Sequence, residues 1–181
     1  MSGDPARRGL FITLEGGEGA GKSTQAARIV ESLRRMGIAA IATREPGGTP
    51  KAEALRAALL TGVVAPLGPA AEAVAFSAAR IDHLDLKIRP ALAAGAWVIC
   101  DRFADSTRAY QGALGHLDPQ LVRAMEHVAV GETRPDLTLM LDLDPEKGLA
   151  RAGARRGDNA ADRFERQNLS FHRALRAAFL G

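Results

Sequence analysis

The residues with the clearest chemistry form the stretch GGEGAGKS at positions 16–23, which fits the spacing G-x-x-x-x-G-K-S. An apolar run, Leu10–Leu14, comes just before it, and this motif requires such a strand to lead into it. The glycines let successive backbone N–H groups turn inward around phosphate oxygens, the lysine reaches the terminal phosphates, and the serine hydroxyl ligates Mg²⁺ at the start of a helix. The pattern therefore predicts a nucleoside triphosphate site. Its expected binding residues are Gly16, Gly17, Glu18, Gly19, Ala20, Gly21, Lys22, Ser23 and Thr24.

A second candidate is the pair Asp101 and Arg102, which closes the apolar run Trp97–Cys100. Phosphoryl-transfer enzymes of this class place a Mg²⁺-associated acid at the tip of such a strand. The planar fork of the arginine suits a second phosphate group. The alternative interpretation is an ordinary salt bridge at the end of a strand. The presence of the phosphate loop favours the interpretation in which Asp101 binds metal and Arg102 binds phosphate.

The segments that must position these residues alternate between strand-like apolar runs and stretches with a helical spacing of apolar residues. Between the strand-like runs lie stretches with helical apolar spacing, which favours a parallel sheet covered by helices. One helix is expected from Ser23 to Met36, and two more begin where Pro119 follows Asp118 and where Pro145 follows Asp144, each an N-cap with proline in the first turn. The strand-like runs are Leu10–Glu15, Ile38–Thr43, Trp97–Asp101 and Leu137–Leu143.

Polar residues gather at the ends of these runs. They are Glu15, the segment Arg44–Pro46, the pair Asp101 and Arg102, and the segment Asp142–Asp144. In open parallel sheets, ligands bind outside the carboxyl ends of the strands, so we expect these side chains to share one site.

Composition bounds the possible functions. The 181 residues are 46% hydrophobic and 25% charged with a formal net charge of +3, which predicts one α/β domain over residues 1–181. Like charges form no long block, so neither nucleic acid nor a membrane surface is expected as a partner. The single cysteine, Cys100, cannot form an internal disulfide, and no apolar run approaches the roughly 18 residues of a membrane span, which indicates a reducing cytoplasm. The four histidines show no metal-ligand spacing.

Four separated segments of the chain resemble the bacterial thymidylate kinases. This resemblance implies a P-loop NTPase-type three-layer α/β/α fold with a parallel sheet, and an enzyme that uses Mg-ATP to phosphorylate dTMP to dTDP in dTTP biosynthesis. It also implies a homodimer, with the helices around Ala70–Leu86 as a candidate interface. The matching segments are Phe11–Thr24, Thr43–Thr49, Ala75–Arg80 and Asp101–Gly112.

The pair Phe76 and Arg80 makes physical sense in that role. The two residues are four apart on a predicted helix and so share a face, where a ring can stack a base and a guanidinium can hydrogen-bond the edge of that base. Thymine offers an O4 acceptor where cytosine has an N4 donor, so a donor-only arginine would reject cytosine. Packing of Phe76 in the core is the alternative.

Other site residues are implied by the resemblance. Tyr110 matches an aromatic residue that packs under the sugar of the acceptor and leaves no room for a 2′-hydroxyl group, and Arg102 and Arg44 match residues that hold the acceptor phosphate. The carboxylate of Glu18 would repel ATP phosphates, so we expect it to face the acceptor. The expected dTMP site comprises Glu18, Arg44, Glu45, Pro46, Phe76, Arg80, Arg102, Ser106, Thr107, Tyr110 and Gln111, and the expected metal site comprises Ser23, Glu15 and Asp101.

The phosphate loop contains no arginine, and relatives of that kind carry their catalytic arginines in a mobile lid. The candidate lid is arginine-rich and spans about residues 151–162. An arginine delivered by lid closure would offset charge on the transferred phosphoryl group, whereas a solvated basic helix end is the alternative. The expected catalytic residues are Lys22, Arg102, Arg151, Arg155 and Arg156.

The resemblance breaks at the carboxyl end. Relatives continue into a further strand and a last helix, whereas this sequence stops at Gly181, so we expect an uncovered sheet edge and an incomplete site for the ATP base. Two alternatives to dTMP kinase activity therefore stay open. One is another deoxynucleotide kinase, and the other is a catalytically weakened nucleotide-binding relative.

Overall fold

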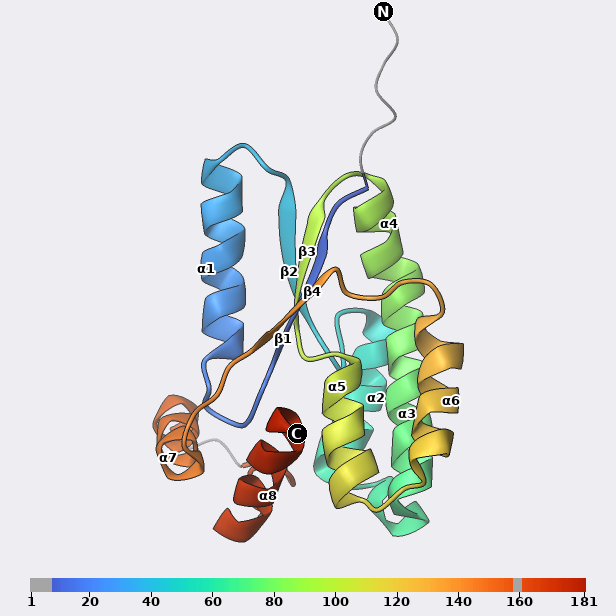
Figure 1. The fold of residues 1–181 in the computed structure, drawn as a ribbon, viewed down its shortest axis with the longest axis vertical. Coiled ribbons are helices and arrows are strands. Elements are labelled where there is room, and N and C mark those ends of the chain that lie inside the picture. The colour runs from blue at the N-terminus through green and yellow to red at the C-terminus, as the bar shows by residue number, and fades with distance from the viewer. Residues whose placement is uncertain (1–7, 158–160) are drawn as a thin grey trace, which may run out of the picture.

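The computed structural model describes residues 8–157 and 161–181. Within these residues, four parallel strands form one sheet in the order β2-β3-β1-β4 (Figure 1). The strands are β1 (Phe11–Glu15), β2 (Ala40–Arg44), β3 (Trp97–Asp101) and β4 (Leu137–Met140). The parallel sheet confirms the expectation, and β3 has the bounds predicted for it. The second strand begins two residues later than predicted and includes Arg44, while β4 ends at Met140, short of the predicted Leu143.

Helices connect the strands. The first helix begins at Lys22 and ends at Arg35, one residue earlier at each end than predicted. The helices in the described part of the chain are α1 (Lys22–Arg35), α2 (Pro50–Thr61), α3 (Gly68–His83), α4 (Arg89–Ala93), α5 (Ala104–Thr107), α6 (Pro119–Val130), α7 (Pro145–Arg156) and α8 (Leu169–Leu180), together with the 3₁₀ turn η1 (Ala65–Leu67) and the π segments η2 (Leu84–Ile88) and η3 (Arg108–Leu114).

Capping side chains explain where several helices begin. The Asp118 carboxylate accepts a hydrogen bond from the backbone N–H of Gln120 at 2.8 Å, and Asp144 accepts one from that of Glu146 at 3.0 Å. Each cap satisfies a backbone donor that the first helical turn leaves unpaired. Both predicted helix starts are therefore confirmed. Thr49 caps α2 in the same way, with proline following it.

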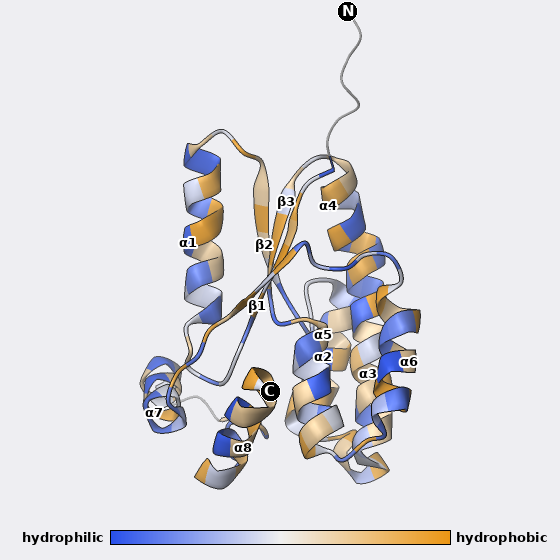
Figure 2. Ribbon diagram, in the orientation of Figure 1, coloured by the Kyte–Doolittle hydropathy of each residue, from blue (hydrophilic) through white to orange (hydrophobic). Residues whose placement is uncertain are grey.

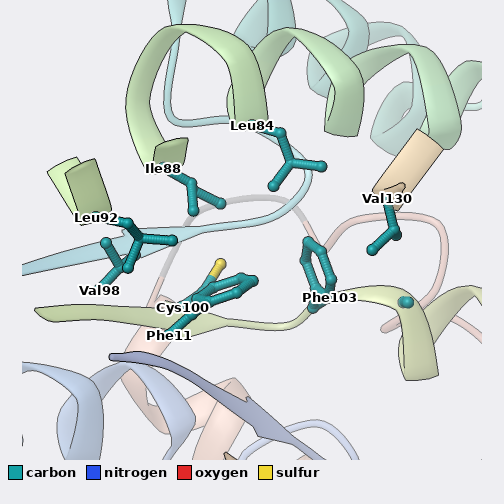
Figure 3. Packing of buried hydrophobic residues seen from close by; sticks show 9 residues of the cluster. Phe11, Leu84, Ile88, Leu92, Val98, Cys100, Phe103 and Val130 are labelled. Atoms are coloured by element: carbon teal, nitrogen blue, oxygen red, sulfur yellow. The ribbon is translucent and has the colours of Figure 1, made fainter. Parts of the chain in front are cut away.

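The helices lie in layers on both faces of the sheet (Figure 1). On one face, α1 packs its apolar side against β1, β2 and β3, and Figure 2 shows that this helix carries both polar and apolar residues. On the other face, the continuous rod of α3, η2 and α4 supplies Leu84, Ile88 and Leu92 to a second core (Figure 3). There the rings of Phe11 and Phe103 meet edge to face, with centroids 5.0 Å apart. These layers confirm the predicted three-layer α/β/α fold.

Cys100 lies in this second core and is fully buried. Burial raises the pKa of its thiol well above the usual value, so the thiol stays protonated and packs as a small apolar group. The interpretation of Cys100 as a buried structural residue is confirmed.

One edge of the sheet is formed by β4. Leu137 is 50% exposed and Met140 is 37% exposed, in line with the expected uncovered edge. Among the described residues, no single helix has the length and apolar composition of a membrane span. One pair of helical stretches, 50–61 and 65–93, passes that test only in combination and is bent by 77°.

Candidate active site

The phosphate loop lies where β1 ends and α1 begins, at the end of the molecule where α7 and α8 also lie (Figure 1). Gly19 has a φ of 67°, and a Cβ on it would lie 1.9 Å from the carbonyl oxygen of Gly148, so no other residue fits there. The Lys22 ammonium donates hydrogen bonds to the carbonyl oxygens of Gly16 at 3.0 Å and Gly17 at 2.7 Å. The loop is therefore folded around its lysine, with the N-terminus of α1 facing the space above it.

A cavity opens beside this loop and brings most of the expected residues together. It is lined by elements far apart in sequence, among them the phosphate loop, β2, α3 and η3. Expected residues that line it are Glu18, Gly19, Gly21, Lys22, Ser23, Arg44, Glu45, Pro46, Phe76, Arg80, Asp101, Arg102, Ser106, Thr107, Tyr110, Gln111 and Arg155.

The remaining expected residues lie elsewhere. Arg151 is exposed on α7 outside the cavity lining, and the side chain of Arg156 lies outside the described part of the chain. The other members of the expected ATP site belong to the phosphate loop or the start of α1 without lining this cavity; they are Gly16, Gly17, Ala20 and Thr24.

Glu15 departs most from its expected role. Its side chain is fully buried, and its carboxylate accepts hydrogen bonds from the backbone N–H of Phe103 at 2.7 Å and the Ser106 hydroxyl at 2.6 Å. Burial raises its pKa, which these hydrogen bonds and the charge of Arg102 oppose. The Glu15 carboxylate thus stabilises the turn that follows β3. The metal role of Glu15 stays a prediction without a contact to support it.

Arg102 is held in an unusual backbone conformation, with a φ of 71°. Its guanidinium donates to the carbonyl oxygen of Gly16 at 3.1 Å, the hydroxyl of Ser106 at 3.2 Å and the carboxylate of Glu18 at 2.5 Å. The Tyr110 hydroxyl donates to the same Glu18 oxygen at 3.0 Å. Arg102 therefore stands at the centre of the site, between the phosphate loop and the helix that follows β3.

The electrostatics of the loop follow from this packing. Burial alone would raise the pKa of Glu18, but the charges of Arg102 and Lys22 outweigh it and hold that pKa at about 2. Burial first and the charge of Arg102 second lower the pKa of Lys22 to about 8, against the opposing charge of Glu18. Glu18 is therefore ionised across the neutral range, whereas Lys22 titrates just above it.

The guanidinium groups of Arg44, Arg56 and Arg102 line one part of the cavity, which we call the arginine wall. Arg44 pairs with the Glu53 carboxylate at 3.0 Å, and Arg56 donates to the carbonyl oxygen of Pro46 at 2.8 Å. Burial lowers the pKa of Arg56, and so do the neighbouring charges of Arg44 and Arg102. Cations crowded in this way favour an anion between them. Sequence reasoning missed Arg56, because only the fold turns this residue of α2 toward the loop.

The aromatic wall of the cavity is formed by Phe76, Tyr110 and Phe164. Phe76 and Tyr110 flank Phe164, with ring centroids 6.4 Å and 5.1 Å from that of Phe164. Phe164 follows the candidate lid and was not among the expected residues. The stretch Asp162–Glu165 is a further segment that resembles the same kinases, but that resemblance assigned it no role. The peptide bond between Glu45 and Pro46, which both line the cavity, is cis.

The donor set for a cation consists of oxygen atoms. The Ser23 hydroxyl hydrogen-bonds the Asp101 carboxylate at the cavity wall. In the described part of the chain, no group of three or more His, Cys, Asp or Glu side chains could hold an ion. One carboxylate and one hydroxyl fit Mg²⁺, which keeps several waters and takes further oxygens from substrate phosphates.

The comparisons with known proteins agree with this geometry. The family described as Thymidylate kinase matches residues 14–181. The chain is 55% identical to the thymidylate kinase of Bradyrhizobium diazoefficiens over 172 residues, which cover 95% of this chain and 75% of that protein. It is also 55% identical to the thymidylate kinase of Nitrobacter winogradskyi over 174 residues, covering 96% and 76%.

A crystal structure of thymidylate kinase from Ehrlichia chaffeensis superimposes with a TM-score of 0.75 at 31% identity, over 96% of this chain and 80% of that one. Sequence and structure thus match the same group of proteins over nearly the whole chain. The chain belongs to the thymidylate kinase family, whose members phosphorylate dTMP.

Proposed function

We propose that the cavity binds Mg-ATP on the phosphate loop and dTMP between the arginine wall and the aromatic wall, and that the chain transfers the γ-phosphoryl group between them. The observation that carries this assignment is the position of Arg102. Its guanidinium contacts Gly16 and Glu18, both in the phosphate loop, and it also lies over the ring of Tyr110 in the aromatic wall at 5.4 Å. A group in that place can neutralise charge on donor and acceptor at once.

The reaction needs no strong general base. An oxygen of the dTMP phosphate attacks the γ-phosphorus of ATP, the bond from that phosphorus to the bridging oxygen of ADP breaks, and the electron pair leaves with ADP. The attacking oxygen is already anionic, so catalysis rests on positioning and charge neutralisation. Lys22, Arg102 and Arg155 line the cavity and supply that neutralisation.

The acceptor phosphate fits the guanidinium groups of Arg44, Arg56 and Arg102. The acceptor base would stack on Phe76 with its edge toward Arg80, and both of these side chains line the cavity. Ser23 and Asp101 would hold Mg²⁺, which supplies charge neutralisation to the ATP phosphates when bound. Each residue then meets the part of a substrate that its chemistry suits.

A second copy of the chain and a cytoplasmic location complete the proposal. Support for the dimer comes from apolar side chains exposed on α3, among them Val74 and Ile81. The single buried thiol of Cys100 agrees with a reducing compartment.

The test is a coupled ADP-release assay with dTMP, dUMP, dCMP and dGMP as acceptors. We expect dTMP to be the best substrate and Arg80→Met to lower kcat/KM for dTMP at least about a hundredfold with little change in ATP affinity, because a charged hydrogen bond in a buried site is lost. The matched control is Arg28→Met, on an exposed face of α1.

Two outcomes would contradict the proposal. Equal losses for dTMP and ATP would remove Arg80 from base recognition. Retained ATP binding with no dTDP formed at saturating substrate would indicate a nucleotide-binding protein without turnover.

A further inference from the structure

His83 is a buried titratable residue with no part in the site described above. It is the last residue of α3, its side chain is fully buried, and it is absent from the cavity lining. Both ring nitrogens have partners: Nε2 lies 2.7 Å from the hydroxyl oxygen of Thr43, and Nδ1 lies 3.2 Å from Oε1 of Glu45. The ring therefore bridges the end of β2 and the loop that follows it.

The chemistry of the partners fixes the direction of these hydrogen bonds. Glu45 is the buried partner of Arg80 at 2.7 Å, and an ionised carboxylate can only accept hydrogen bonds. Nδ1 of His83 must therefore donate to Glu45. In the neutral ring, Nε2 then accepts the hydroxyl proton of Thr43, and each ring nitrogen has one role.

Glu45 divides its two oxygens between two partners. Oε1 accepts from His83, and Oε2 accepts from Nε of Arg80. A carboxylate held at one oxygen cannot rotate freely about its last bond, so the histidine sets the plane in which the arginine meets its partner. This contact is the link from His83 to the cavity.

Arg80 is in turn oriented by its other contacts. Its Nη2 donates to the carbonyl oxygen of Phe103 at 3.0 Å and to the hydroxyl of Thr107 at 3.1 Å. Nη1 is left without a hydrogen bond to the described residues, although Arg80 lines the cavity and is almost fully buried. One donor group is thereby available to a base edge, in a direction that Glu45, Phe103 and Thr107 define.

The surroundings leave His83 little room to move. A Cβ on Gly48 would lie 2.5 Å from Nε2 of His83 and 2.8 Å from the hydroxyl oxygen of Thr43. The loop backbone thus packs directly on the hydrogen-bonded pair. Because the His83 ring cannot shift, its hydrogen bond fixes the position of the Glu45 carboxylate.

We propose that His83 is a positioning residue for the acceptor base: through Glu45 it holds Arg80 in the orientation that distinguishes thymine from cytosine. The inference rests on the proposed function, in which Arg80 meets the base. It assigns His83 no contact with substrate and no proton transfer.

The experiment compares His83→Asn with His83→Leu. An asparagine amide nitrogen stands near the place of Nδ1 and can still donate to Glu45, whereas leucine keeps the bulk without a donor. We expect His83→Leu to raise the KM for dTMP about tenfold or more, to leave the KM for ATP within about twofold, and to lower the preference for dTMP over dCMP. His83→Asn should restore the dTMP KM to within about threefold of the wild type. The matched control is His127→Leu, at an exposed position of α6.

Other outcomes overturn the proposal. Equal defects in both variants, or KM values for dTMP and ATP that rise together, would mean that His83 acts only through stability. If His83→Leu does not fold by circular dichroism, Thr43→Val decides, because it removes the hydroxyl partner of Nε2 at nearly constant volume. A dTMP KM unchanged in Thr43→Val overturns the inference, and a selective rise supports it. Failure of the proposed function is distinguishable, since Arg80→Met would then also leave dTMP use unaffected.

Discussion

Lys22 is a residue of the site whose charge we expect to change with pH near neutrality. Its pKa of about 8 reflects burial first and the charge of Arg102 second. ATP phosphates favour the ammonium form, so binding above pH 8 must take up a proton. We expect ATP affinity to fall as pH rises through 8 and above, by up to about tenfold per unit for one proton. Isothermal titration calorimetry at pH 8.5 in two buffers of different ionisation enthalpy measures that proton uptake.

The control for this prediction is Lys22→Arg, because an arginine stays protonated at every pH used. Its ATP binding should take up no proton and should lose the pH slope. The same pKa shift affects folding: the unfolded lysine titrates near 10.5 and the folded one near 8, so the unfolded chain binds more protons between these values and folding stability rises with pH there. A pH slope that persists unchanged in Lys22→Arg would contradict the assignment to Lys22.

At the scale of single residues, the sequence predicts what is local. The phosphate loop could be predicted because its glycines, lysine and serine all lie within eight consecutive positions, 16–23. Arg56 and Phe164 were missed because each reaches the cavity through packing of distant elements, α2 against α3 in one case and the segment after the lid against η3 in the other. Glu15 is the reverse case. Its position at the end of β1 could be predicted from the sequence, but the hydrogen bonds that its carboxylate accepts from Phe103 and Ser106 could not.

Among the elements, α7 carries the candidate lid arginines, and the structure distinguishes between two of them. Arg155 lines the cavity, whereas Arg151 does not. We expect Arg155→Ala to lower kcat at least about a hundredfold, toward the 10³ to 10⁵ typical of arginine fingers, with substrate KM values little changed. Steady-state kinetics of Arg155→Ala and Arg151→Ala check this expectation. A loss in Arg151→Ala as large as that in Arg155→Ala would show that the cavity lining does not identify the catalytic arginine.

The segment after the lid is tied to the other helices. The Arg163 guanidinium pairs with the Glu72 carboxylate of α3, and its backbone N–H donates to the carbonyl oxygen of Leu60 at 3.3 Å. Asp162 caps the following turn by accepting from the backbone N–H of Phe164 at 2.8 Å. Phe164 is thereby fixed beside Phe76 and Tyr110.

Helix starts could be predicted where a cap and a proline stand together, as at Asp118 and Asp144. The start of α3 was not predicted, because Gly68 and the following proline occur in a stretch, Val63–Pro69, that reads as a loop. The π segments η2 and η3 were not predicted from the sequence. The first joins α3 to α4, and the second extends α5 as far as Leu114.

In the whole molecule, the phosphate loop and the residues proposed to bind the acceptor come from different parts of the chain. The phosphate loop connects β1 to α1, whereas the residues proposed to bind the acceptor come from β2, α3 and the helical segment after β3. The parallel order β2-β3-β1-β4 brings the carboxyl ends of these strands to one edge, so the site depends on the sheet as a unit. That juxtaposition was predictable from the alternation of strands and helices, whereas the pairing of Arg102 with Glu18 was not.

The outer face of α3 carries an apolar stripe away from the cavity. Val74 and Ile81 lie seven residues apart on this helix and are 57% and 37% exposed, and Leu67, seven residues before Val74 in the turn η1, is 74% exposed. A spacing of seven keeps side chains on one face of a helix, and such a stripe suits packing against another helix. This arrangement supports the proposed association of two copies through α3.

We therefore expect Val74→Glu to convert a dimer to monomers, with the dissociation constant raised at least about a hundredfold, because an unpaired carboxylate would be buried at the contact. Sedimentation velocity across a range of concentrations measures the change. Met36→Glu is the matched control, since Met36 is 70% exposed at the end of α1 on the opposite side of the sheet, and it should leave the dimer intact. The α3 stripe is excluded as the contact if Val74→Glu sediments as the wild type does, or if both substitutions dissociate the dimer equally.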